Sequence, residues 1–143
     1  MKNPLVADLM VSCIALARER HRFHLIAYAV MPEHVHLLLW PRIPGSSCRQ
    51  ALATMKMSFA ARALARWKEL KAPLLKRLTD PQGRLCVWQR GGGYDRNIMS
   101  DEERLEKATY IHTNPCSAGL CIRPEEYRWS SAAWYKGNKA EAA

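Results

Sequence analysis

Hydrophobic and polar positions predict a helix near the beginning of the chain. Between residues 4 and 20 apolar side chains recur at helical spacing, and basic residues follow where a helix dipole favours cations. The expected buried stripe comprises Leu5, Leu9, Val11 with Ser12, and Leu16. The apolar stretch is shorter than the about 20 residues that span a bilayer. A secretory signal is the weaker alternative, because Asp8 interrupts the stretch and three arginines follow it.

Two strand-like segments follow, over residues 24–31 and 34–40. Only Pro32-Glu33 separates them, and strands joined by so short a connection must be antiparallel. Side chains alternate along the second segment, so that one face is apolar and the other carries histidine. The apolar face, which we expect to pack under helices, consists of Val35, Leu37 and Leu39.

Two further elements are predicted before the glycine run at residues 91–93. Apolar positions recur at helical spacing over residues 47–69, and residues 85–89 have the composition of a short strand. With a last helix after the glycines, the order is helix, hairpin, helix, strand, helix. That order predicts an α+β fold in which helices pack on an antiparallel sheet.

The last helix opens at Ser100, which forms a capping box with Glu103, and should stop at about Thr113 because Asn114 precedes a proline. Its expected core stripe is Leu105, Ala108 and either Ile111 or His112. Tyr110 and Asn114 lie one turn apart on a neighbouring face. Spacing alone favours packing at the core edge for Tyr110 and a helix-capping role for Asn114.

The net charge of +9 is concentrated in the middle of the chain. Residues 42–90 hold 11 Lys and Arg against two Asp and Glu, so the rest of the chain is neutral. Such a segment suits nucleic acid or an anionic membrane face, and a solvated basic surface is the equal alternative. Five cysteines without a C-x-x-C pair indicate reduced thiols in a cytosolic protein. A length of 143 residues predicts a single domain over residues 1–143.

His34 and His36 are candidates for a metal site. Residues two apart in a strand point to the same face, about 6.6 Å apart along the chain, so two imidazoles can converge on one cation. Taken alone, this spacing favours ordinary, partly buried histidines over a metal site.

Several sequence words, in family order, resemble those of single-tyrosine HUH transposases. They are Ala29-Val30-Met31-Pro32-Glu33-His34-Val35-His36-Leu37-Leu38, Trp88-Gln89, Gly93-Tyr94-Asp95-Arg96-Asn97, Tyr110-Ile111-His112-Thr113-Asn114-Pro115, Gly119-Leu120 and Pro124-Glu125-Glu126-Tyr127-Arg128-Trp129-Ser130-Ser131-Ala132. Each word is moderately specific, and their common order makes the set strongly so. Over about residues 24 to 135 the chain resembles the REP-associated tyrosine transposases.

The resemblance implies a ferredoxin-like or RRM-like HUH domain that cleaves and rejoins single-stranded DNA. It assigns the metal-binding histidines to His34 and His36, the nucleophile to Tyr110, and a polar third ligand to Asn114. The expected ion is Mg²⁺ or Mn²⁺, and the expected intermediate is a 5′-phosphotyrosine. The implied partner is hairpin-bearing single-stranded DNA, bound by a monomer or homodimer with no membrane attachment. The expected location is the cytoplasm, in association with the nucleoid.

The DNA-binding candidates are basic residues of the middle segment together with residues 94–96 of the Gly93-Tyr94-Asp95-Arg96-Asn97 motif. They are Arg49, Lys56, Arg62, Arg66, Tyr94, Asp95 and Arg96. Lysines and arginines would follow the phosphate backbone, and Tyr94 would stack on a base. For Trp88 a core position is favoured over base stacking.

The beginning of the chain departs from the family, whose members usually open with a strand before the first helix. The sheet is therefore expected to lack that strand, which would expose a sheet edge and part of the core. Three interpretations remain. The first is an active DNA transposase, and the second a truncated, non-catalytic nucleic-acid-binding domain of the same fold. The third is a plain metal-binding or structural domain.

Overall fold

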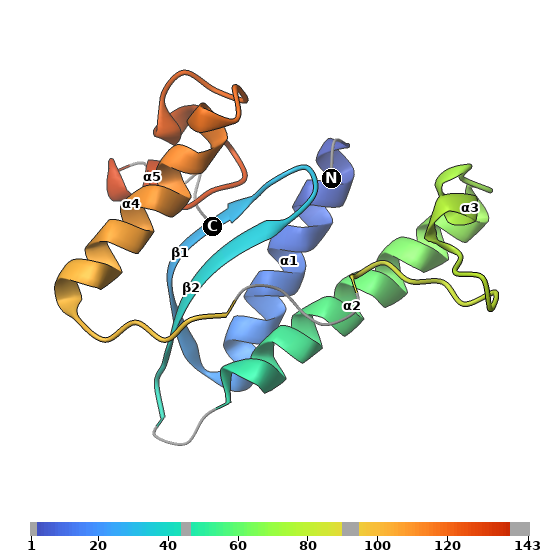
Figure 1. Cartoon of the computed structure of the whole chain (residues 1–143), viewed down its shortest axis with the longest axis horizontal. Helices are drawn as coiled ribbons and strands as arrows, with labels where there is room; N and C mark the ends of the chain where they lie inside the picture. The colour runs from blue at the N-terminus through green and yellow to red at the C-terminus, as the bar shows by residue number, and fades with distance from the viewer. Residues whose placement is uncertain (1–2, 44–46, 90–94, 138–143) are drawn as a thin grey trace.

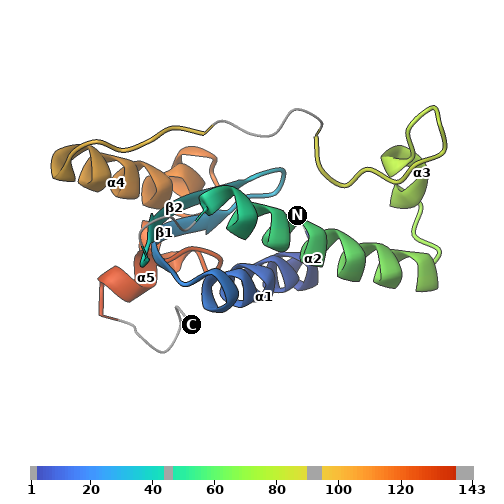
Figure 2. The same ribbon diagram turned by 90° about the horizontal axis from the view of Figure 1, so that it is seen from below.

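The computed structural model describes residues 3–43, 47–89 and 95–137. Its elements are α1 (Pro4–His21), β1 (Phe23–Val30), β2 (Val35–Pro41), α2 (Cys48–Glu69), α3 (Leu74–Leu78), α4 (Asp101–Ser117), a 3-10 turn η1 (Pro124–Glu126) and α5 (Ala132–Tyr135). Helices α1 and α2 cover one face of the β1–β2 hairpin, and α4 covers the other (Figures 1 and 2). This arrangement confirms the predicted α+β class with an antiparallel sheet.

The hairpin sets the position of both histidines. Met31 N donates to the His34 carbonyl at 2.9 Å, which closes the turn around Pro32-Glu33. The register places Ala29 opposite His36, and the only irregularity between the strands lies at Leu25/Ala27, well away from this end. Within the described residues the sheet has two strands.

Two apolar clusters pack on the two faces of the hairpin. The predicted inward-facing side chains of β2, which are Val35, Leu37 and Leu39, do pack against the α1–α2 cluster. On the opposite face the smaller cluster joins β1, Leu38 and α4 through Ala27, Ala29, Met31, Ala108 and Ile111. Among the described residues no helix is long and apolar enough to span a bilayer.

Helix α1 buries a different stripe from the one expected. Leu5 is 75% exposed and Leu16 is 46% exposed, so two of the expected leucines face solvent. The buried stripe is Ala7, Met10, Cys13, Ile14 and Ala17. Alanine and cysteine side chains are small, so this face lets α1 lie close to α2 and the sheet, a packing need that residue size alone does not reveal.

The buried face of α1 predicts which substitutions in this helix lower the free energy of unfolding. Ile14→Ala should lower the free energy of unfolding by about 2–5 kcal/mol, because it leaves a cavity at a side chain that is 1% exposed. The matched substitution Leu16→Ala should change it by about 0.5 kcal/mol or less, as is usual for a surface position. Urea unfolding of both variants measures the difference, and a larger cost for Leu16→Ala would contradict the observed packing face.

The predicted strand at residues 85–89 is wrong. Within the described residues an isolated bridge joins Leu85 to Thr79, and Val87 and Trp88 are partly buried by packing against the α1–α2 cluster rather than by strand pairing. Trp88 stacks near Phe59, with ring centroids 5.4 Å apart, and its Nε1 donates to the Lys56 carbonyl at 2.9 Å. Trp88 is therefore partly buried at the edge of the core, in keeping with the packing role favoured for it, although it also lines the groove described below. The short helix α3 is an element that the sequence analysis did not predict.

Helix α4 continues past the point where it was predicted to stop. Pro115 lacks an N–H and so removes one helical hydrogen bond, yet the helix extends to Ser117. Pro115 is fully buried, and its carbonyl accepts from Leu120 N at 2.9 Å. This packing compensates for the lost bond. Ala108 and Ile111 form the buried stripe as expected, but Leu105 is 70% exposed.

Residues 127–135, here called the C-terminal strap, close the outer edge of β1. Val30 N donates to the Trp129 carbonyl at 2.8 Å, and Ser131 N donates to the Tyr28 carbonyl at 3.1 Å. Tyr127 OH donates to the Val30 carbonyl at 2.8 Å. The strap therefore replaces a third strand along this edge.

Candidate functional site

The two candidate metal-binding histidines face each other. Their Nε2 atoms are 3.0 Å apart, and their ring centroids are 4.7 Å apart with the planes almost perpendicular. His34 lies in the turn just before β2, while His36 is the second residue of the strand. Both ring nitrogens thus converge on one point, as the spacing requires for a shared cation.

Helix α4 brings Tyr110 to the same point. The ring centroid of Tyr110 lies 5.7 Å from that of His36, in an edge-to-face arrangement. Tyr110 is 54% exposed, so a large substrate can reach its side chain. The helix is held there because Ala108 and Ile111, on the adjacent face, pack onto the hairpin.

Asn114 completes the group one turn after Tyr110. Its side chain lies beside that of His36 and, through a hydrogen-bonding interaction, raises the pKa of the imidazole. Burial, followed by the nearby His34, lowers the pKa of His36, and the hydrogen bond to Asn114 only partly opposes this shift. A lowered pKa keeps His36 neutral at physiological pH, which leaves a ring lone pair to bind a cation.

The donor set at this point fits a divalent cation bound through nitrogen and oxygen. Two imidazoles and one amide oxygen are compatible with Mn²⁺, and less typically with the more oxygen-selective Mg²⁺. Among the described residues, no group of three or more His, Cys, Asp or Glu side chains is arranged to hold a metal ion. A metal at this site would therefore need Asn114 as its third protein ligand.

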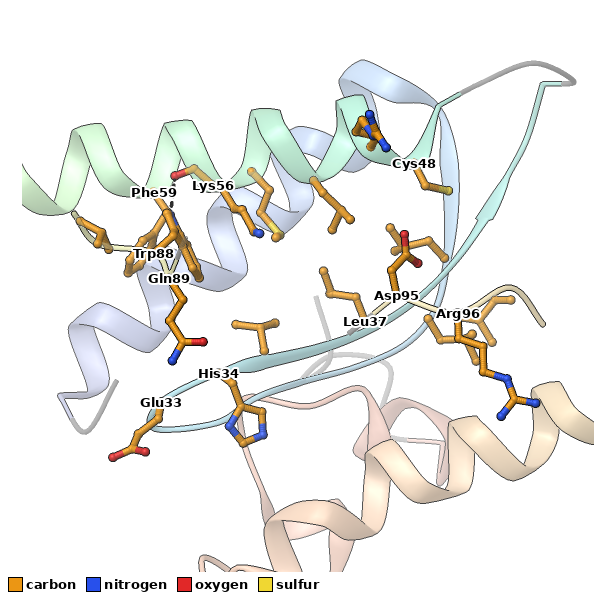
Figure 3. Close-up of a pocket in the computed structure, with 18 of the residues that line it drawn as sticks. Glu33, His34, Leu37, Cys48, Lys56, Phe59, Trp88, Gln89, Asp95 and Arg96 are labelled. Atoms are coloured by element: carbon orange, nitrogen blue, oxygen red, sulfur yellow. Dashed lines mark hydrogen bonds between the residues drawn. The ribbon is translucent and has the colours of Figure 1, made fainter. Parts of the chain in front are cut away.

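A groove of about 1820 Å³ begins beside His34 and follows the outer edge of β2. Figure 3 shows it between α2 on one side and Asp95 and Arg96 on the other. We call this feature the β2 groove. Four of the predicted DNA-binding residues line it: Arg49, Lys56, Asp95 and Arg96.

The other predicted DNA-binding residues do not line this groove in the described structure. Arg62 points toward α1, where Nη1 lies 3.9 Å from Cys13 Sγ, and Arg66 pairs with Glu69 at 3.0 Å. Tyr94 lies outside the described residues. The sequence interpretation also missed an exposed tryptophan, Trp40, at the far end of the groove. Its signal was the alternation that places it on the same strand face as His36.

Fold and site together define a class: an α+β domain in which a histidine pair at the turn end of a β-hairpin meets a tyrosine on a helix. No protein-family model matches the chain, and no curated protein matches it. Its structure is similar to a solved structure of a REP-associated tyrosine transposase bound to a REP hairpin, with a TM-score of 0.70 at 15% sequence identity. The similarity covers 92% of this chain and 67% of that one. The chain therefore has the fold of a REP-associated tyrosine transposase.

Proposed function

We propose that this protein is a metal-dependent transposase that cleaves and rejoins hairpin-bearing single-stranded DNA through Tyr110. The observation that carries the proposal is the meeting of Tyr110 with His36, His34 and Asn114, from two elements distant in sequence. The fold is shared with a transposase that was solved with a hairpin bound, and the basic middle segment suits a polyanion.

In the proposed reaction Tyr110 is the nucleophile. Its phenolic oxygen attacks the scissile phosphorus while the phenolic proton is lost, and the bond to the 3′-oxygen of the preceding nucleotide breaks. The products are a 5′-phosphotyrosine and a free 3′-hydroxyl. Attack of a 3′-hydroxyl on the phosphotyrosine rejoins the strand and returns Tyr110, so no external energy source is needed.

His34, His36 and Asn114 would hold Mg²⁺ or Mn²⁺ beside the phosphate. When bound, the ion polarises the phosphate and stabilises charge that develops on it. Asn114 adds no negative charge, which eases the approach of a phosphodiester. The neutral state of His36 favours ligation over repulsion of the cation.

Adduct formation tests this function. Purified protein incubated with single-stranded hairpins from its own genomic flanks should form a covalent adduct with Mn²⁺, and none with a chelator. A shifted band in a denaturing gel measures it. Salt-sensitive binding without an adduct would support the non-catalytic nucleic-acid-binding alternative instead. Absence of both would leave a structural or metal-binding role.

A further inference from the structure

The two edges of the hairpin differ in the described structure. The C-terminal strap closes the outer edge of β1, whereas β2 pairs with β1 alone and its other edge has no backbone partner among the described residues. The β2 groove lies along this second edge. It begins at His34, in the candidate site, and reaches Trp40 at the other end of the strand.

Basic side chains stand on both sides of this groove. Arg49, Lys56 and Arg77 come from α2 and α3, and within the described residues none of the three forms an ion pair. On the other side Arg96 pairs with Glu103 at 2.6 Å, and Arg104 pairs with Asp101 at 3.1 Å. The three acidic lining residues are Glu33, Asp95 and Asp101. The α2 side therefore offers unpaired positive charge along an apolar floor.

Trp40 supplies a flat aromatic surface at the end of the groove. It is 53% exposed although it sits in a strand, and the regular alternation of β2 places it on the same face as His36. Trp40 follows His36 by four positions, which places the two residues about 13 Å apart along the strand. An exposed indole at one end of a groove that also carries arginine and lysine is a combination that binds single-stranded nucleic acid, because bases stack on the ring while cations contact phosphates.

We propose that the β2 groove binds the unpaired DNA flank that leads to the cleaved phosphate, and that Trp40 stacks on one of its bases. This inference rests on the proposed function, since it places the substrate relative to Tyr110. Within the described residues the cations of the α2 side form no ion pair, which favours a polyanion over a polypeptide strand as the occupant of the groove. Trp40 thus acts as a binding residue that fixes the register of the strand.

The inference is tested by measuring how one substitution changes the affinity of the protein for two oligonucleotides. Trp40→Ala should weaken binding of a hairpin with a single-stranded flank about tenfold, and leave binding of the blunt hairpin unchanged. Trp40→Phe should restore most of the loss because a smaller ring still stacks. Trp134→Ala is the matched control, since Trp134 is also about half exposed, at 46%, but does not line the groove.

Abasic nucleotides locate the contact. In a series of flanks that each lack one base, one position should weaken the wild-type protein about tenfold and leave the Trp40→Ala protein unaffected. If the wild-type and Trp40→Ala proteins bind the flanked hairpin equally well, the groove assignment is wrong. It is also wrong if the wild-type protein is a dimer that Trp40→Ala converts to a monomer, since a second copy of the chain would then occupy the groove. Either outcome can occur while Tyr110 still forms its adduct. A protein that neither binds the hairpin nor forms an adduct would refute the proposed function itself.

Discussion

Replacing Tyr110 with phenylalanine should abolish the covalent protein–DNA adduct and leave hairpin binding almost unchanged. The substitution removes only the phenolic oxygen that forms the bond to phosphorus. Because Tyr110 is 54% exposed, the free energy of unfolding should change by about 0.5 kcal/mol or less. Denaturing gels and a filter-binding assay on the same preparations separate the two effects.

Tyr135→Phe is a matched control for this experiment. Tyr135 has the same exposed fraction, 54%, but its hydroxyl donates to the Ile26 carbonyl and its ring stacks on His112, away from His36. It should keep adduct formation. An adduct formed by the Tyr110→Phe protein would show that another tyrosine is the nucleophile. Tyr127 would be a poor candidate, because it is buried with its hydroxyl bound to Val30.

His36→Ala should reduce the rate of adduct formation by more than about 100-fold at a fixed, limiting Mn²⁺ concentration. Loss of an outer partner of a metal ligand already costs about 10–100-fold in affinity or activity, and this change removes a ligand. It also removes the ring that contacts both Tyr110 and Asn114. The measurement is the adduct rate as a function of Mn²⁺ concentration.

His24→Ala is the control histidine, because His24 is exposed on β1 and lies opposite Trp40, at the other end of the hairpin from His36. Its rate should match that of the wild-type protein at every Mn²⁺ concentration. If the His36→Ala protein follows the same curve, the ion does not bind at the histidine pair. The Tyr110 proposal would then need a different means of activation.

Local patterns predicted those elements whose limits are set by nearby residues. The hairpin was expected over residues 24–31 and 34–40, and it occupies Phe23–Val30 and Val35–Pro41. The Pro32-Glu33 turn fixes this register without help from the rest of the chain. Likewise the side chain of Ser100 accepts from Glu103 N at 3.1 Å, so α4 begins where its capping box predicted.

Predictions failed where packing between distant segments decides the outcome. The buried face of α1 depends on how closely α2 can approach, which favours Ala7 and Ala17 over the larger Leu16. Pro115 continues a helix because burial compensates for its missing hydrogen bond. Among the residues that the structure describes, the run at 85–89 pairs through a single bridge at Leu85.

The candidate site was predicted from the resemblance of short sequence motifs to a known family, and not from hydrophobic periodicity or spacing. Alternation in the second strand predicted one face for both histidines, but nothing local placed Tyr110 beside them. The meeting of α4 with β1 and β2 is a tertiary contact, made through alanines that leave little trace in a hydrophobicity pattern. The β2 groove likewise could not be anticipated, because it depends on which sheet edge the strap covers.

The C-terminal strap has a consequence for the rate of folding. Tyr127 bonds to Val30 across 97 residues, and Trp129 bonds to Asp8 across 121. Closing a chain loop of about 100 residues costs about 4 kcal/mol of entropy, far more than the local turn of the hairpin. Contacts at such sequence separation slow folding. We therefore expect helix α1 and the hairpin to form early and the strap to attach late in folding.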